Sequence, residues 1–255
     1  MSPKPGLLTR AARRLRKGAT QAWPGKMIKS RLERPVASIV FDDFAQSAWT
    51  VGGRILEAAG ARGTYFVSGS YCGREADGIR YFEPDDLVAA HGSGHEIGCH
   101  TFDHRTVSNL PAADIETSLA RNQGFVRGLI GDVIMTSFAF PHGETSIRTK
   151  RLMGGHFAAC RGIFPGINTG SIDLSQLKGV ELVPYVLKSY SIDRMIEAAV
   201  ANRGWLILIC HDVASEHSPW GCAPQTLEEA VSKLQAANIE MLPIKSALGR
   251  VAFAH

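Results

Sequence analysis

The chain has 255 residues, of which 45% are hydrophobic and 20% charged, as expected of a folded globular protein and not of a disordered one. A chain of this length can bury a full core, so it needs neither disulfides nor a structural metal for stability alone. The net charge of +4 divides unevenly, with +9 in residues 1–34 and −5 in residues 35–255. This distribution argues against nucleic-acid binding across the body of the protein.

The basic segment 1–34 is predicted to be a poorly structured or peripheral arm that precedes one catalytic domain over residues 35–255. Arginines interrupt its apolar residues, so it lacks the apolar stretch of a secretory signal, and no run of about 20 apolar residues predicts a membrane span. The alternative to a solvated leader is an amphipathic segment that contacts anionic lipid. Five cysteines without CxxC spacing argue against a thiolate zinc site and a disulfide scaffold, and favour a cytoplasmic location.

Short apolar runs alternate with helical patterns from Val36 onward. Strands are predicted at 36–41, 64–67, 96–99, 137–140, 157–160, 181–184, 205–210 and 239–242, and helices at 47–59, 84–91, 111–129, 192–201 and 226–237. Buried strands that alternate with helices predict a mostly parallel sheet with the helices outside. Seven or eight such units favour a single-domain α/β fold, a distorted (β/α)7-8 barrel, over an open sheet.

Polar residues follow four of the predicted strands, at the end where barrel enzymes carry their catalytic groups. These residues are Asp42 and Asp43, His100 and His104, His142 directly after Pro141, and His211 and Asp212. Carboxylates and imidazoles from separate strands are therefore expected to converge on one rim of the barrel.

Two histidine pairs have the spacing of four that places both rings on one face of a helical turn. His91 and His95 enclose two glycines and precede their strand, so we interpret His91 as a surface residue and His95 as a structural hydrogen-bonding residue. His100 and His104 follow a strand, and with Asp43 they provide the two imidazoles and one carboxylate of an open divalent-metal site.

The adjacent aspartates on their own would equally suit a turn or a helix cap. Beside a metal, Asp42 has a chemical use, because it can accept a proton from a water whose pKa the metal lowers.

Four segments resemble, in order and spacing, the motifs of the polysaccharide deacetylase family, also known as the NodB homology domain or carbohydrate esterase family 4. They are Phe41-Asp-Asp-Phe44, His100-Thr-Phe-Asp-His104, Phe138-Ala-Phe-Pro-His-Gly143 and Leu206-Ile-Leu-Ile-Cys-His211. The resemblance implies a distorted barrel with one divalent metal, usually zinc, with Co²⁺, Ni²⁺ and Mn²⁺ as alternatives. It also implies hydrolysis of an acetyl group, most often an N-acetyl group on a hexosamine.

The resemblance implies a role for each matching residue. Asp43, His100 and His104 match the metal ligands, Asp42 the general base, and His211 the general acid that protonates the leaving amine. The backbone N–H of His142, next to Pro141, matches the oxyanion donor, and Leu208 matches a wall of the pocket for the acetyl methyl group. Trp220 is expected to stack on a sugar face or to cap the barrel, and Asp212 to anchor His211 or its loop.

The chain departs from the family pattern at three places. Phe44 stands where the first motif usually has glycine, and we expect it to narrow the cleft. Ala139 stands in place of the arginine that orients the base; Arg161 is the candidate substitute, with a surface charge as the alternative. The fourth motif is not recognisable, and Asp173 is the nearest replacement for its aspartate.

The sequence thus predicts a cytoplasmic, metal-dependent N-deacetylase that acts on a sugar, glycolipid or oligosaccharide intermediate. The lack of an export signal favours a biosynthetic precursor over a cell-wall polymer as substrate. Two alternatives are another C–N hydrolase on the same scaffold, such as a deformylase or an imide or ureide hydrolase, and a catalytically silent glycan-binding protein. The presence of all three ligand residues with Asp42 and His211 argues against the silent protein.

Overall fold

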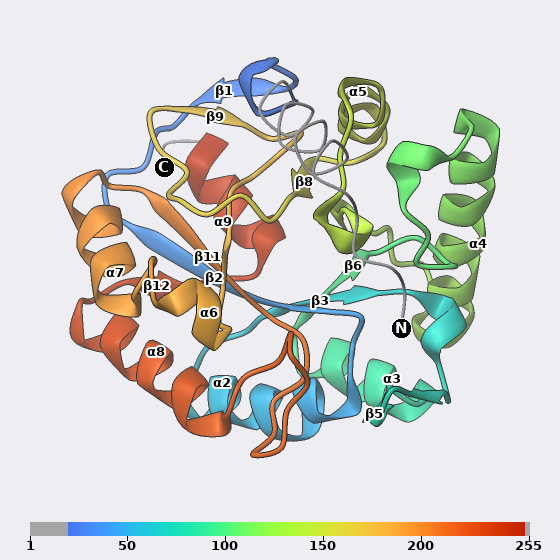
Figure 1. The fold of residues 1–255 in the computed structure, drawn as a ribbon, viewed down its shortest axis with the longest axis horizontal. Helices are drawn as coiled ribbons and strands as arrows, with labels where there is room; N and C mark the ends of the chain where they lie inside the picture. Colours follow the sequence, from blue (N-terminus) through green and yellow to red (C-terminus); the bar gives the residue numbers. More distant parts are fainter. Residues whose placement is uncertain (1–19, 253–255) are drawn as a thin grey trace, which may run out of the picture.

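The computed structural model describes residues 20–252, which fold around a curled sheet of eight parallel strands (Figure 1). The strands are β2 (Val36–Asp42), β3 (Thr64–Val67), β6 (Glu96–Cys99), β7 (Ser137–Ala139), β8 (Ala159–Arg161), β10 (Val180–Glu181), β11 (Trp205–Cys210) and β12 (Glu240–Met241). Their order is β10-β11-β2-β3-β6-β7-β8, and β12 pairs with the start of β2. Backbone hydrogen bonds join Cys160 and Gly162 to the segment 174–177, which leads into β10. The two ends of the sheet are thereby linked, and the predicted distorted barrel is confirmed.

Helices cover the outside of the sheet (Figure 1). They are α2 (Arg54–Ala58), α3 (Pro84–Gly92), α4 (Ala112–Ile130), α5 (Ile147–His156), α6 (Pro184–Leu187), α7 (Ile192–Ala201) and α8 (Pro224–Ala236). The final helix α9 (Ile244–Ala252) instead packs its Ile244 and Val251 side chains against residues of the inner core. The predicted helix 47–59 is a π-helix, η1 (Ala48–Gly53), that continues into α2.

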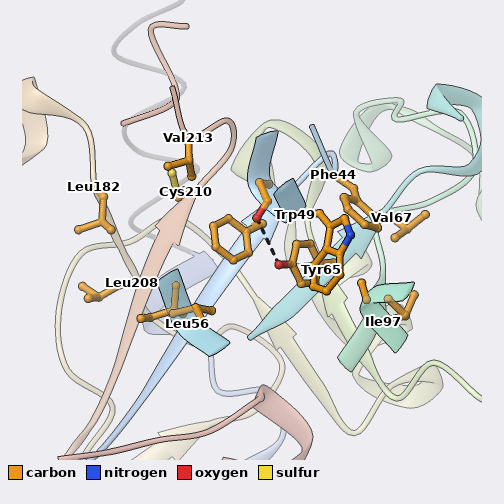
Figure 2. Close-up of a cluster of buried hydrophobic side chains, with 14 of the residues drawn as sticks. Phe44, Trp49, Leu56, Tyr65, Val67, Ile97, Leu182, Leu208, Cys210 and Val213 are labelled. Atoms are coloured by element: carbon orange, nitrogen blue, oxygen red, sulfur yellow. Dashed lines mark hydrogen bonds between the residues drawn. The ribbon is translucent and has the colours of Figure 1, made fainter. Parts of the chain in front are cut away.

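The strand β11 shows how side-chain alternation divides the core into two. Leu208 and Cys210 belong to the outer cluster under the helices, together with Leu56 of α2 (Figure 2), whereas Ile207 and Ile209 belong to the inner cluster. Successive side chains of a strand point to opposite faces. Full burial of each of these aliphatic side chains contributes on the order of 2 kcal/mol. The alternation therefore fixes which side of β11 faces the barrel interior.

Several predicted elements are shifted or shortened. Strand β8 begins after Phe157, because the Phe157 N–H still closes the end of α5 by donating to the Met153 carbonyl. The strand predicted at 181–184 is reduced to β10, since Pro184 has no N–H for pairing and instead begins α6. Helices α5 and α9, and the hairpin formed by β4 (Glu75–Ala76) and β5 (Ile79–Arg80), were not predicted.

The described part of the predicted arm, residues 20–34, is ordered against the body; residues 1–19 lie outside the described range. Strand β1 (Met27–Lys29) pairs with β9 (Ser171–Asp173) in antiparallel fashion. The buried Lys150 ammonium donates to the carbonyls of Thr20 and Trp23 and lies 2.7 Å from Asp173 Oδ2. Asp173 is therefore engaged at this edge and does not replace the missing fourth-motif aspartate. No helix of residues 20–252 is both long and apolar enough to span a membrane.

Candidate metal centre and active site

Three ligand-type side chains meet at the carboxyl ends of β2 and β6. One ligand atom of each of Asp43, His100 and His104 lies within 4.8 Å of the other two. Asp43 Oδ1 is 3.4 Å from His100 Nε2 and 3.0 Å from His104 Nε2. Asp43 and His104 have φ values of +63° and +50°, an uncommon backbone region for non-glycine residues. The backbone thus turns sharply after each strand and brings the three side chains to one point.

The donor set fits a single divalent cation. Asp43 Oδ1 is buried and has no hydrogen-bond donor among the described residues, and such an unpaired oxygen is costly unless something else satisfies it. Two imidazoles and one carboxylate suit zinc and neighbouring transition metals, and they leave coordination positions open for water and substrate.

The two histidines are held with Nε2 toward Asp43. His100 Nδ1 donates to the Ala139 carbonyl at 2.8 Å, and His104 Nδ1 lies 2.9 Å from the Tyr71 hydroxyl. A hydrogen bond at Nδ1 fixes the tautomer and the ring orientation of a ligating histidine. Burial lowers the pKa of His100, and burial followed by the charge of His100 lowers the pKa of His104 to about 2. Both rings are therefore neutral at neutral pH, as metal ligands must be.

Tyr71, at the end of η2 (Gly69–Tyr71), was not predicted from the sequence. Its ring stacks on Tyr81 with centroids 4.4 Å apart, which holds the hydroxyl against His104. Tyr71 and His104 are 33 residues apart, and no motif marks the tyrosine. Only the folded arrangement of η2 beside the histidine loop reveals the contact.

Asp42 is the last residue of β2 and is 4% exposed. Arg161 Nη2, at the end of β8, donates to both of its carboxylate oxygens at 2.5 Å. Burial would raise the pKa of Asp42, but the charge of Arg161, followed by those of His100 and His211, outweighs burial and lowers it. Asp42 is therefore ionised at neutral pH. Arg161 pairs in register with Ala139 on the neighbouring strand, so it reaches Asp42 from beside the position where the third motif usually has arginine.

His211 follows β11 and faces Asp42. Its Nε2 is 4.0 Å from Asp42 Oδ2, and its Nδ1 donates to the Trp220 carbonyl at 3.1 Å. Asp212 accepts hydrogen bonds from the N–H and the hydroxyl of Ser218, at 2.7 and 2.5 Å, so it anchors the loop and not the ring of His211. The Trp220 side chain is 52% exposed.

The short helix η4 (Pro141–Gly143) places His142 beside the metal-ligand candidates. The His142 and His104 rings are 4.5 Å apart at their centroids, and Pro141 is buried beneath the exposed His142. The turn requires Gly143, which has a φ of +63° and where a Cβ would lie 2.3 Å from Ile163.

Two site predictions are corrected. Leu208 is fully buried on the helix-facing side of β11 (Figure 2), so it cannot form the wall of a pocket inside the barrel; Ile209 is the neighbouring residue that faces inward. Phe44 does not narrow the cleft, because its ring is buried in the core, 4.8 Å from Phe82 and 4.6 Å from Tyr65 at the ring centroids.

The rival histidine pair is structural. His95 Nδ1 accepts the Gly63 N–H at 3.0 Å, and its ring makes edge contacts with Trp49 and Tyr65. Burial, followed by the charge of Arg62, lowers the pKa of His95 to about 4. His91 lies in the last turn of α3 and is half-buried.

Comparison with sequence families matches residues 29–154 to a family described as polysaccharide deacetylase. That range contains β2 and β6 with all three ligand candidates. No curated protein matches the chain.

Solved structures share the fold at low sequence identity. A structure described as T48 deacetylase with substrate has a TM-score of 0.60 and 19% identity, and the match covers 87% of this chain and 94% of that one. A family 4 acetyl xylan esterase from Clostridium thermocellum, in complex with a cobalt ion, has a TM-score of 0.56 and 20% identity, with coverage of 84% and 90%. A mutant of a carbohydrate esterase family 4 pseudoenzyme has a TM-score of 0.61 and 12% identity, with coverage of 89% and 72%. The motifs and the match over residues 29–154 show that this chain resembles the polysaccharide deacetylase family, and the solved structures show that it shares their fold.

Proposed function

We propose that this protein is a metal-dependent hydrolase that removes an N-acetyl group from an amino sugar in a saccharide, glycolipid or oligosaccharide. The observation that carries the proposal is the convergence of Asp43, His100 and His104 with the Arg161-bound Asp42 and with His211 at one end of the barrel. The family match supports a carbohydrate as the acetylated substrate.

Amide hydrolysis needs a nucleophilic water, a polarised carbonyl and a proton for the amine. A divalent cation held by Asp43, His100 and His104 would polarise the carbonyl and lower the pKa of water, with zinc the first expectation and Co²⁺, Ni²⁺ or Mn²⁺ as alternatives. Asp42, held ionised, accepts the proton of the attacking water. The backbone N–H of His142 donates to the oxygen that gains negative charge.

Arg161 acts through Asp42 as a positioning residue. It is 1% exposed and its guanidinium lies over the Phe66 ring, 5.2 Å from the centroid, so it cannot swing away from the carboxylate. The contact of one Nη2 with both oxygens fixes the carboxylate plane and favours its charged form. This arrangement supports a working general base in a chain that has Ala139 in its third motif.

His211 supplies the proton to the leaving amine. Because its Nδ1–H donates to the Trp220 carbonyl, a neutral ring carries no proton on Nε2. Only the imidazolium form can donate from Nε2, which lies 4.0 Å from Asp42 Oδ2. The exposed side chain of Trp220, whose carbonyl accepts from His211, offers an apolar face for a sugar ring.

The test is acetate and formate release by the metal-loaded protein from N-acylated nucleotide sugars, lipid-linked sugars and oligosaccharides. We expect acetate from at least one N-acetylated amino sugar, and a loss of about 10²- to 10⁴-fold in the matched variant Asp42→Asn, which leaves the three ligands intact. Release of formate without acetate would show that the protein is a deformylase and not a deacetylase. Release of neither acid by protein shown to contain metal would leave a silent glycan-binding relative.

A further inference from the structure

Cys210 and Cys222 lie in contact at the base of the loop that carries His211. Their Sγ atoms are 3.1 Å apart, and neither residue is more than 1% exposed. Cys210 ends β11, and Cys222 lies two residues before α8. The two cysteines therefore bracket residues 211–221, the segment that contains both His211 and Trp220.

Backbone hydrogen bonds already hold the two cysteines side by side. The Cys222 N–H donates to the Asp212 carbonyl at 3.0 Å, and the Ala214 N–H donates to the Cys222 carbonyl at 3.2 Å. Val213, which lies next to Cys210 in Figure 2, forms a β-bridge with Cys222. A disulfide requires two cysteines whose backbones are close and whose side chains point at each other. This pair meets that requirement, because the β-bridge brings the two backbones together and the two sulfur atoms are in contact at 3.1 Å.

We propose that Cys210 and Cys222 form a disulfide bond when the chain folds in the presence of a disulfide oxidant. The oxidant is a low-molecular-weight disulfide or a dithiol–disulfide oxidoreductase. One cysteine thiolate displaces a thiolate from the oxidant and forms a mixed disulfide. The second cysteine attacks that mixed disulfide and releases the other thiol. One S–S bond replaces two S–H bonds, and the oxidant takes both electrons and both protons.

Because Cys210 and Cys222 are buried in the folded protein, the disulfide forms during folding and not afterwards. The hydrogen bond with Cys222, followed by burial, raises the pKa of the Cys210 thiol, and a buried neutral thiol is inert because the thiolate is the reactive form. The bond therefore forms while β11 and the loop are still accessible, and the closed fold then shields it from reductants. The described residues show no second sulfur–sulfur contact among the five cysteines.

The disulfide would join the two ends of the loop that carries His211, the proposed general acid, into a closed ring. Within that ring the loop is also held by the bonds from His211 to Trp220 and from Ser218 to Asp212. Closing the ring removes conformational freedom from the unfolded chain at this segment. The oxidised protein should accordingly be the more stable form.

The first test uses the wild-type chain and requires no enzyme activity. The protein is refolded with reduced and oxidised glutathione, or with dithiothreitol alone, then denatured and treated with N-ethylmaleimide. We expect three adducts after oxidative refolding and five after reduction, together with a peptide that joins Cys210 to Cys222. Five adducts under both conditions, or a different joined pair, would overturn the proposal.

The second test is the melting temperature of the two forms. A ring of this size predicts a rise of roughly 5 to 10 °C on oxidation. Cys160 is a buried cysteine of β8 outside the pair, so Cys160→Ala should show the same rise in melting temperature on oxidation as wild type. Cys222→Ser should have the same melting temperature with and without dithiothreitol. An unchanged melting temperature in wild type whose disulfide has been verified by mass would refute the stabilising role.

Discussion

At the residue scale, Arg161 shows how a neighbouring strand can provide a side chain that a motif lacks. It lies 119 residues from Asp42 in sequence and directly beside Ala139 across the β7–β8 pairing. From the sequence, Arg161 is the candidate substitute for the arginine that orients the base, with a surface charge as the alternative. The register of β8 against β7, which no local pattern encodes, decides that it points to Asp42.

Replacement of Arg161 should impair catalysis without removing the metal site. Arg161→Lys keeps the charge but loses the contact with both oxygens, and we expect kcat/KM to fall by on the order of 10²-fold. Metal content should stay that of wild type, because Asp43, His100 and His104 are untouched. Arg194→Met, an exposed arginine of α7, is the control. Wild-type kinetics in folded Arg161→Lys would contradict the positioning role.

Tyr71 should contribute to metal affinity. Tyr71→Phe removes the acceptor for the buried His104 Nδ1–H, and loss of such a partner typically weakens metal binding by about 10- to 100-fold. The measurement is competition with a chromophoric chelator for Zn²⁺ or Co²⁺. Tyr81→Phe is the matched control. It also removes one hydroxyl from the stacked pair of rings, but His104 contacts the hydroxyl of Tyr71 and not that of Tyr81. Equal dissociation constants for the two variants would exclude this role.

Leu208 and Phe44 mark two limits of reasoning from motifs. Leu208 precedes His211 by three residues, an odd number, so side-chain alternation assigns it to the opposite face of β11. Phe44 has a φ of +54°, and this turn of the backbone directs its ring into the core between Tyr65 and Phe82, which no local sequence pattern indicates.

At the element scale, the elements with strong periodic patterns were predicted well, and the elements defined by long-range contacts were not. β2 and β11 are continuous apolar runs, buried along their whole length, and were found within one residue of prediction. β1 and β9 are three-residue strands that exist because they pair with each other across about 145 residues. The helix α5 contains Gly154 and Gly155, which weaken its local helical signal.

His95 should make stability depend on pH where α3, β3 and β6 meet. Its pKa is near 6.5 in the unfolded chain and about 4 in the folded protein. Between these values the unfolded chain binds a proton that the folded protein does not. Stability is therefore fully present above about pH 6.5 and falls as the pH drops toward 4, by up to about 3 kcal/mol.

Urea unfolding at pH 7.5 and pH 5 measures this effect. His95→Gln, which keeps an acceptor for the Gly63 N–H, should show a smaller loss of free energy of unfolding between the two pH values than wild type. The exposed His156→Gln should behave as wild type. The same pH dependence in all three proteins would show that His95 does not titrate as described.

At the scale of the whole molecule, the parallel sheet explains why the site could be anticipated. All strands of the barrel run in one direction, so residues that follow β2, β6, β7 and β11 must gather at one end. The shared strand direction therefore predicts, from the sequence alone, that Asp42, Asp43, His100, His104, His142 and His211 lie at that end. Strand direction alone leaves Arg161 open between Asp42 and the surface, because strand register decides where its side chain points. It gives no sign of Tyr71, whose contact with His104 depends on a stacked pair of rings.

The most direct test of the account is the metal stoichiometry of purified wild-type, His104→Gln and Asp42→Asn proteins after dialysis against Zn²⁺, measured together with deacetylation. We predict one metal per chain in wild type and in Asp42→Asn, with activity lost in the latter, and loss of both tightly bound metal and activity in His104→Gln. One metal per chain retained at wild-type affinity in folded His104→Gln would show that Asp43, His100 and His104 do not form the metal centre.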